Sequence, residues 1–343
     1  MAAERRSEGI ETALTRRTVL AAGAAGAASL AIGDPTKSLK RKWPKALSAG
    51  DTVALVAPAS PTEQKDVDDV VARFSALGLK TRPMAHLLEK TGLFAGPDAD
   101  RAADINGAIK DDAIDAIACV RGGWGCARIL PLIDWAALRA NPKPIIGFSD
   151  VTSLLVAAWL KAGVVSYHGM WVPHLDDPFT LAAWKRALMT TEPLDLLGFD
   201  NPSYAARSMV SGSGSVRGVL LGGNLTVLNQ LIGTGYLPSF EGAIGFFEDT
   251  GEPPYRLDRM LTQMRMAGQL KGVKGIVLGQ FVKCDDAELN LKGADTLHEF
   301  FASLRVPTVV NAPFGHVRHQ VILPVGAEVE LTTGPTPALK VER

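Results

Sequence analysis

Short apolar runs that alternate with amphipathic segments most constrain the fold of this chain. Apolar runs over Thr52–Val56, Ile114–Val120 and Pro144–Phe148 each lead through a turn into a helical pattern, as over residues 63–77. This alternation is typical of βαβ units, in which helices cover both faces of a parallel sheet. Ligands of such sheets bind beyond the carboxyl ends of the strands. We therefore look for chemistry in the turns that follow these three runs.

A second group of elements follows a stretch rich in Ser and Gly at residues 208–215, a composition typical of a flexible connection. Beyond it the sequence predicts strands at 216–221, 243–248, 275–278 and 308–310, a helix at 254–268, and antiparallel strands at 321–323 and 328–331. We predict an α/β N-terminal domain over 48–200, a linker over 201–215, and a smaller mixed β/α C-terminal domain over 216–343.

Charge and cysteine content exclude several classes of protein. The 343 residues carry 36 Lys and Arg against 36 Asp and Glu, so a nucleic-acid partner is not expected. The three cysteines are too few for a disulfide scaffold and lack the spacing of a zinc site.

The N-terminus has the features of an export signal. Arg16 and Arg17 precede an uncharged stretch over residues 18–33, with small residues at 29–31. We predict a twin-arginine signal peptide over residues 1–31, a basic solvated tether over 32–47, and delivery to the periplasm or another extracytoplasmic compartment. The uncharged stretch is shorter than the ~20 residues of a membrane span, so no integral span is expected in the mature protein. A plain N-terminal tail is the alternative.

Ser149 follows the third apolar run and precedes a helical pattern. A serine at a sharp strand-to-helix turn resembles a nucleophile elbow, although residues 147–150 (GFSD) depart from the G-x-S-x-G form. The backbone N–H of Asp150 would then be free to donate to an oxyanion. The alternative is that Ser149 caps the helix, which is a common use of serine.

A glycine-rich turn follows the second run, over residues 121–125 (RGGWG). Three glycines in five residues indicate either close approach of a ligand to the backbone or a left-handed turn. If this turn faces Ser149, a glycine N–H can serve as a second oxyanion donor.

The second domain offers an acid and a base. Glu248 and Asp249 end an apolar run, where the acids either lie at a site or cap the next turn on the surface. His316 follows another strand on a loop that contains Gly and Pro, and is the best placed of the six histidines to act as a base. His319 lies three residues on, but no metal-binding motif accompanies the pair. Ser, acid and His together form the set that a nucleophile, its base and an orienting carboxylate require.

These segments resemble the LD-carboxypeptidase family of serine peptidases, which includes murein tetrapeptide carboxypeptidases and microcin C immunity proteins. The matching stretches, in the family's order, are residues 50–60, 121–125, 147–152, 167–169, 222–225, 248–259 and 314–316. They span nearly all of the predicted mature chain. Phe148 departs from the tyrosine that is common in the family.

The resemblance implies roles for residues of these motifs. Ser149 would be the nucleophile, His316 the general base and Glu248 the carboxylate that orients it, with an oxyanion hole of backbone N–H groups near Gly123 and of Asp150. It also implies a flavodoxin-like N-terminal domain, no metal or other cofactor, and members that are often homodimers.

The resemblance implies a murein peptide as substrate, a tetrapeptide stem that loses its terminal D-Ala. Candidates for contact with this substrate are Ser60, Arg121, Trp124 and His168, and Arg121 could meet the free carboxylate or form a structural ion pair instead. The alternatives are an amidase of the microcin C immunity type and a non-catalytic muropeptide-binding protein.

Overall fold

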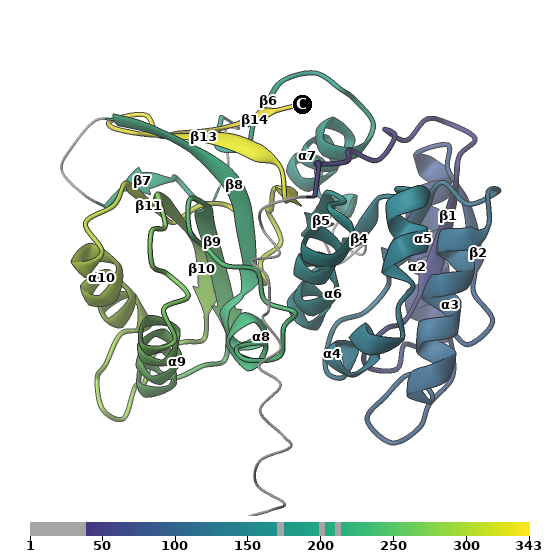
Figure 1. The fold of residues 1–343 in the computed structure, drawn as a ribbon, viewed down its shortest axis with the longest axis horizontal. Helices are drawn as coiled ribbons and strands as arrows, with labels where there is room; N and C mark the ends of the chain where they lie inside the picture. The colour runs from purple at the N-terminus through teal and green to yellow at the C-terminus, as the bar shows by residue number, and fades with distance from the viewer. Residues whose placement is uncertain (1–38, 170–174, 199–202, 210–213) are drawn as a thin grey trace, which may run out of the picture. The chain divides into compact units, whose positions relative to one another are not determined.

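The computed structural model describes residues 39–169, 175–198, 203–209 and 214–343 (Figure 1). The predicted signal peptide at residues 1–31 and the first part of the predicted tether lie outside these ranges. Within the described ranges, no helix combines the length and the apolar content that a membrane crossing requires.

Six strands form the first sheet, in the order β12-β5-β4-β3-β1-β2. They are β1 (Thr52–Val56), β2 (Lys80–Pro83), β3 (Ala116–Cys119), β4 (Ile145–Gly147), β5 (Ser166–His168) and β12 (Leu323–Val325). Strands β1 to β5 are parallel, and β12 is antiparallel to β5. The order 2-1-3-4-5 is that of flavodoxin-like sheets, whose ligand crevice opens where the order reverses, between β1 and β3. The predicted flavodoxin-like domain is confirmed.

Helices pack on this sheet because its strands carry apolar residues on both faces. They are α2 (Gln64–Ala76), α3 (Asp98–Lys110), α4 (Cys126–Ile129), α5 (Trp135–Ala140) and α6 (Thr152–Ala157). Every residue of β3 and β4 is buried, as expected of a covered parallel sheet. In α2 the buried residues Val67, Val70 and Phe74 recur at helical spacing, which sets the face that packs inward.

Eight strands form the second sheet, in the order β6-β14-β13-β8-β9-β10-β11-β7. They are β6 (Leu194–Asp195), β7 (Arg207–Ser208), β8 (Gly214–Asn224), β9 (Ile244–Thr250), β10 (Gly275–Val282), β11 (Thr308–Val310), β13 (Glu328–Thr333) and β14 (Ala338–Glu342). Strands β8 to β11 are parallel and the outer pairs are antiparallel. The predicted mixed β/α character of this part is therefore confirmed.

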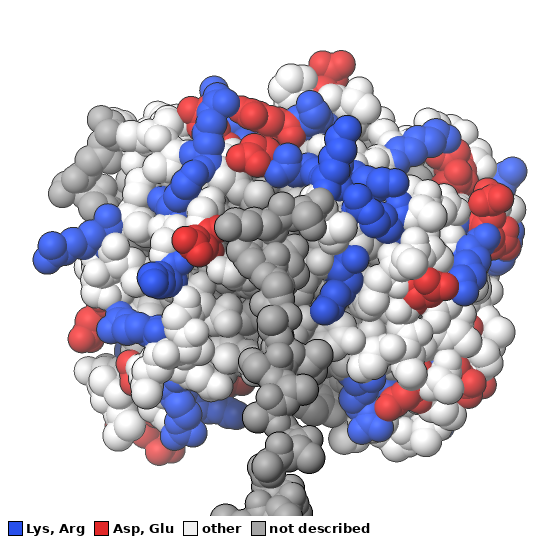
Figure 2. All heavy atoms as spheres, in the orientation of Figure 1, with Lys and Arg blue, Asp and Glu red and all other residues white. Residues whose placement is uncertain are grey.

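Four further helices lie later in the chain, α7 after β5 of the first sheet and the other three after strands of the second sheet. They are α7 (Pro178–Leu188), α8 (Leu225–Gln230), α9 (Pro254–Met266) and α10 (Gly293–Ser303). Figure 1 shows α8, α9 and α10 on the same side of the parallel strands β8, β9 and β10. On the face in view, acidic and basic side chains are interspersed (Figure 2). Arg217, for example, pairs with Glu330 at 3.1 Å and with Glu342 at 2.8 Å.

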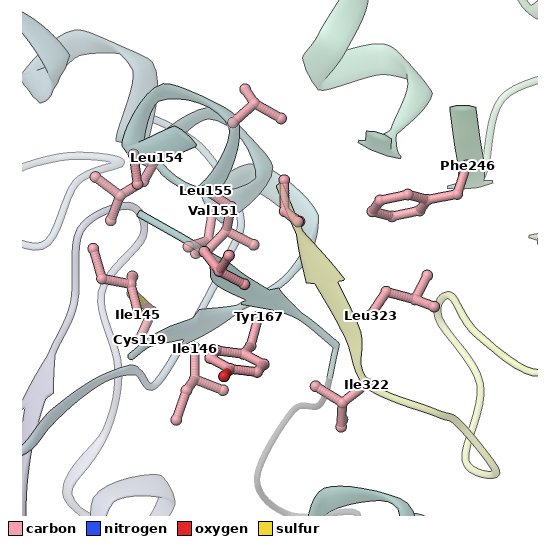
Figure 3. Packing of buried hydrophobic residues seen from close by; sticks show 14 of the residues in the cluster. Cys119, Ile145, Ile146, Val151, Leu154, Leu155, Tyr167, Phe246, Ile322 and Leu323 are labelled. Carbon is pink, nitrogen blue, oxygen red and sulfur yellow. The ribbon is translucent and has the colours of Figure 1, made fainter. Parts of the chain in front are cut away.

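The chain returns from the second half to complete the first sheet. The short strand expected at residues 321–323 forms as β12 and pairs with β5, so that Leu323 lies opposite His168. Apolar side chains of both halves pack around it in one buried cluster, in which Phe246 and Leu323 lie on one side of β12 and Tyr167 lies on the other (Figure 3). This cluster fixes the end of the loop that precedes β12, which carries His316.

Two glycines at the end of β8 allow close contacts, Gly222 with the neighbouring strand β9 and Gly223 with the first half. A Cβ atom on Gly222, at φ 155°, would lie 1.9 Å from the carbonyl oxygen of Phe246, and one on Gly223 would lie 2.4 Å from Thr152 Cγ2. Thr152 belongs to the turn that follows Ser149, and its Oγ1 accepts the N–H of Asn224 at 3.1 Å. Only glycine allows this contact between β8 and the start of α6.

The prediction of a solvated tether is wrong for residues 39–47. Lys42 forms a bridge with Val164, Arg41 Nε donates to the carbonyl of Gly326 at 2.8 Å, and Leu47 is buried. The run of charges concealed this packing, because only one side of the segment faces solvent while its backbone and its apolar residues attach to the fold.

Candidate active site

Three side chains from distant parts of the chain form a continuous hydrogen-bonded series. His316 Nε2 lies 3.2 Å from Ser149 Oγ, and His316 Nδ1 lies 2.7 Å from Glu248 Oε2. Because Nδ1 donates its proton to the carboxylate, the neutral imidazole presents an unprotonated Nε2 to the hydroxyl. This is the geometry that a base needs in order to take the proton of a hydroxyl.

Ser149 closely follows β4 and is the first residue of the 3₁₀ helix Ser149–Val151. Its φ is 60°, in the left-handed region that costs a non-glycine residue about 1–2 kcal/mol. The alternative that Ser149 caps the helix is wrong, because the cap position is Phe148 and no side-chain capping bond forms. The turn instead directs the hydroxyl toward His316, as in a nucleophile elbow.

The His316 loop is fixed at both sides of the histidine. Before it, Gly315 takes a φ of 117°, and a Cβ there would lie 3.2 Å from Glu248 Cβ. After it, Thr180 Oγ1 donates to the carbonyl of Arg318 at 2.8 Å and accepts the N–H of Gln320 at 3.1 Å. The Phe148 ring packs against the imidazole with centroids 5.0 Å apart.

The α7 N-terminus provides this anchor, which we did not predict from the sequence. Asp177 caps the helix through the N–H of Thr180 at 2.9 Å, and Asp176 pairs with Arg318 at 2.9 Å. The residues 176–180 (DDPFT) do have the pattern of a capped helix start with proline. That pattern predicts a helix, but it says nothing of which loop packs against it.

Glu248 is fully buried within β9, not at the end of the strand or in a surface cap as the sequence left open. Its Oε1 has no hydrogen-bond partner among the described residues. A buried carboxylate is costly unless a donor or a positive charge compensates it. An imidazolium on His316 would supply that charge.

The neighbouring acid, Asp249, has a structural role. Asp249, also buried, accepts the amide of Asn224 at 3.0 Å and the N–H of Thr226 at 2.9 Å, so it holds the first turn of α8. Successive side chains of a strand point to opposite faces, which separates the two carboxylates. Burial and the charge of Glu248 raise the pKa of Asp249 above its usual range.

The glycine-rich turn after β3 lies beside Ser149, as the sequence suggested. A Cβ on Gly122 would be 2.9 Å from Ser149 Cβ, and one on Gly123, at φ 104°, would be 2.3 Å from Ser60 Oγ. Within the ranges that the structure describes, the N–H groups of Gly123 and Asp150 have no acceptor. The residue after Ser149 and the residue after Gly122 thus each carry an unused backbone donor.

Two protein-family models match this chain. The LD-carboxypeptidase N-terminal domain matches residues 53–169, and the LD-carboxypeptidase C-terminal domain matches residues 217–331. The chain belongs to the LD-carboxypeptidase family. It is accordingly a serine-type carboxypeptidase.

Among its relatives are two carboxypeptidases named for murein. The chain is 33% identical to the probable murein peptide carboxypeptidase of Bacillus subtilis, over 86% of this chain and 93% of that protein. It is 32% identical to the murein tetrapeptide carboxypeptidase of Pseudomonas aeruginosa, over 80% of this chain and 91% of that protein.

Solved structures share the fold of this LD-carboxypeptidase. The muramoyltetrapeptide carboxypeptidase from Oxalobacter formigenes is 29% identical and has a TM-score of 0.74, over 85% of this chain and 99% of that one. MccF in complex with glutamyl sulfamoyl guanosine has a TM-score of 0.80 over 88% of this chain and 98% of that one. At 21% identity, MccF shows the fold alone.

The four candidate substrate contacts of this LD-carboxypeptidase differ in exposure. The Trp124 side chain is 52% exposed, and the backbone N–H of Trp124 donates to Ser60 Oγ at 3.1 Å. Arg121 is exposed and lies 3.6 Å from Asp66. It therefore forms an ion pair, which the sequence analysis gave as the alternative to a contact with the substrate. The prediction that His168 contacts the substrate is wrong, because this side chain is 0% exposed.

His168 instead belongs to the packing behind the site. It lies in β5 with its ring 5.3 Å from that of Phe246, and neither ring nitrogen has a partner among the described residues. Burial, with the nearby His316, lowers the pKa of His168 to about 3. The imidazole is therefore neutral.

Neither histidine of the His316–His319 pair is arranged as a metal ligand here, because His316 serves Ser149 and Glu248, and His319 Nδ1 lies 2.9 Å from Asp177. Elsewhere in the described chain, donor atoms of His86 and Glu89, in the loop before α3, and of Asp100, in the first turn of α3, lie within 4.8 Å of one another. The three cysteines are buried free thiols.

The charge state of His316 provides a test of this geometry. Burial disfavours the imidazolium, but the hydrogen bond and charge of Glu248 outweigh it, so the pKa of His316 is raised above 6.5. We predict that Glu248→Gln lowers this pKa, because burial then acts with little opposition. The measurement is an NMR titration, with the His316 signal assigned from its loss in His316→Gln.

The matched control is Glu299→Gln, which makes the same change at an exposed acid of α10. It should leave the His316 titration unchanged. A His316 pKa that is the same in Glu248→Gln as in the unmodified protein would show that the two side chains are not coupled.

Proposed function

We propose that this enzyme removes the terminal D-Ala from murein tetrapeptide stems through an acyl-enzyme on Ser149. The observation that carries the proposal is the unbroken series Ser149, His316 and Glu248, at 3.2 Å and 2.7 Å, beside two unused backbone donors. The murein-related names of the relatives support the substrate class.

In the first half of the proposed reaction, His316 Nε2 takes the Ser149 proton as Oγ forms a bond to the carbonyl carbon. The N–H groups of Gly123 and Asp150 donate hydrogen bonds to the carbonyl oxygen and stabilise the negative charge that develops there. The C–N bond then breaks, and the imidazolium gives its proton to the nitrogen of the departing D-Ala. Glu248 stabilises the imidazolium throughout because it is a buried anion within 2.7 Å.

In the second half, water replaces D-Ala in the site. His316 takes a proton from the water, whose oxygen attacks the ester carbonyl. The ester bond to Ser149 Oγ breaks, and the proton returns from His316 to the serine. The products are the shortened stem and free enzyme, and the protein returns to its starting charge state.

A carboxypeptidase of this kind must distinguish a D-residue from an L-residue on the two sides of one bond. We propose that the exposed turn of residues 121–125 forms part of the wall that makes this distinction, with Trp124 as a contact surface. Arg121 is the candidate for the free carboxylate, since its partner Asp66 lies at 3.6 Å and both are partly exposed. Because an exposed ion pair is weak, Arg121 can leave Asp66 and bind a carboxylate of the substrate instead.

The second candidate is an amidase of the microcin C immunity type. Its support is the similarity of fold to MccF structures, which include complexes with aminoacyl sulfamoyl nucleosides. Low identity limits this support to the fold, whereas the murein-named relatives exceed 30% identity. A muropeptide-binding protein without catalysis is the third candidate.

Defined substrates separate these candidates. Incubation with L-Ala-γ-D-Glu-diaminopimelate-D-Ala, with its Lys counterpart, and with glutamyl sulfamoyl adenosine is followed by mass spectrometry. We expect loss of one alanine from at least one tetrapeptide, labelling of Ser149 by a fluorophosphonate, and neither result in Ser149→Ala. Both results depend on the Ser149 hydroxyl, which is the only group that Ser149→Ala removes.

Cleavage of the sulfamoyl nucleoside alone would favour the immunity-type amidase. Binding of the tetrapeptide without labelling or hydrolysis would favour the binding protein. Hydrolysis by Ser149→Ala at the unmodified rate would exclude the acyl-enzyme.

We also propose that residues 1–31 direct export by the twin-arginine route, from the Arg16–Arg17 pair and the uncharged stretch that follows it. Replacing both arginines with lysine keeps the charge but removes the guanidinium groups, and we predict that the precursor then stays in the cytosol. Fractionation of a bacterial host measures this, with Arg5→Lys as the control. Unchanged export of the double variant would contradict the proposal.

A further inference from the structure

An arginine lies in the interior of the first domain. The side chain of Arg101, on α3, is 0% exposed. Its guanidinium donates to the carbonyl of Gly125 at 3.0 Å, to the carbonyl of Pro58, and to the carboxylate of Asp98. Burial of a guanidinium is costly, so such a residue is retained where its hydrogen bonds hold something in place. Here the carbonyls belong to the turns after β1 and β3.

Asp150 binds the N–H group of the peptide bond whose carbonyl, that of Gly125, Arg101 binds. Its carboxylate, 2% exposed, accepts the N–H of Cys126 at 2.8 Å. The carbonyl of Gly125 and the N–H of Cys126 are the two polar groups of one peptide unit. Arg101 therefore binds one end of this unit and Asp150 the other. We call this arrangement the peptide clamp.

The peptide clamp joins the two structures that carry the unused donors. Asp150 directly follows Ser149, and its own N–H is one of them. The clamped peptide lies two residues after Gly123, whose N–H is the other. Fixing the peptide to the Asp150 side chain therefore fixes the separation of the two N–H groups.

The turn needs such a restraint because of its glycines. Gly123 and Gly125 have φ values of 104° and 115°, and a glycine explores far more backbone conformations than other residues do. A Cβ on Gly125 would lie 2.5 Å from the Phe94 ring, so this position cannot be stiffened by a larger residue. The hydrogen bonds from Arg101 and to Asp150 supply the rigidity that the sequence of the turn lacks.

We propose that Arg101 and the Asp150 carboxylate are positioning residues that set the geometry of the oxyanion hole. This inference rests on the proposed function, since an oxyanion hole has a role only if Ser149 attacks a carbonyl. Backbone donors stabilise a developing oxyanion only when they are already aimed at it. Displacement of a reacting or stabilising group by about 1 Å can lower the rate by about 100-fold.

The charge of Asp150 fits this role at neutral pH. Burial raises the pKa of Asp150 to about 6, against the opposing effects of the Cys126 N–H, Arg101 and Gln230. The carboxylate is therefore ionised at pH 7. An ionised acceptor makes a stronger hydrogen bond to a backbone N–H than a neutral one does.

The test is a set of four variants measured at pH 7.5 on the tetrapeptide that the enzyme hydrolyses. Asp150→Ala removes the acceptor, Asp150→Asn keeps an oxygen that can accept the Cys126 N–H, and Arg101→Met removes the donor. The control is Arg128→Gln, because the Arg128 side chain binds Asp98 at 2.9 Å and packs on Phe94 as that of Arg101 does. Only the backbone N–H of Arg128 reaches the clamped peptide, at the carbonyl of Gly125, and the substitution keeps that bond.

We expect Asp150→Ala and Arg101→Met to lower kcat by about 10- to 100-fold, with KM changed by less than about threefold. Asp150→Asn should recover part of the kcat that Asp150→Ala loses, because its neutral oxygen still accepts the Cys126 N–H but makes a weaker bond. Arg128→Gln should stay near the unmodified enzyme. Affinity for a peptide boronate, which forms a tetrahedral anion on Ser149, should fall in parallel with kcat.

Unchanged kcat in Asp150→Ala and Arg101→Met would overturn the proposal, and so would equal losses in Asp150→Ala and Asp150→Asn. If Arg101→Met does not fold, by circular dichroism, the comparison of the two Asp150 variants still decides. Failure of the proposed function has a different signature, because the unmodified protein would then neither hydrolyse the tetrapeptide nor bind the boronate.

Discussion

The hydrogen bond between Glu248 and His316 is the interaction on which this site depends. It fixes the ring so that Nε2 points at Ser149, and it sets the charge that the ring can carry. A fully buried carboxylate is stabilised most when the imidazole becomes protonated, which in the proposed reaction is the step at which the Ser149 proton is transferred. The burial of Glu248 is therefore a source of the chemistry as well as a cost to stability.

The two sheets are arranged to keep this hydrogen bond intact. Ser149 belongs to the first sheet and Glu248 to the second, so an independent movement of the two halves would break the series. Strand β12, which pairs with β5, and the anchor at Thr180 hold the intervening His316 loop to the first half. Gly223 at the end of β8 lets the second half pack against the helix that follows Ser149. Each of these contacts joins segments far apart in the sequence.

Local patterns in the sequence predicted the elements that carry the site. The strands before Ser149 and Glu248 and the parallel first sheet followed from apolar runs, because burial of a covered strand leaves a direct record in composition. The strained turn at Ser149 was visible as a serine at a strand-to-helix junction, although its φ of 60° was not. The convergence of Ser149, Glu248 and His316 came from the ordered family motifs.

The contacts that hold the site were not predictable in the same way. Arg101 looks like an ordinary charged residue of an amphipathic helix, and Asp176 and Asp177 look like a helix cap. The error at residues 39–47 has the same cause, since charge indicates exposure of a side chain and not the course of the backbone. His168 matched a family motif, yet its strand places it in the interior. Such placements depend on tertiary packing, which no local pattern encodes.

The most direct test of the account is whether the three side chains act as one unit. The measurement is kcat for Ser149→Ala, for His316→Ala and for the variant that carries both changes, on the same peptide substrate. If the hydroxyl and the imidazole form one catalytic unit, the double variant is no slower than the slower single variant, because either change alone already removes the reaction path. If the two losses multiply instead, the residues act independently, and the proposed transfer of a proton from Ser149 to His316 is wrong.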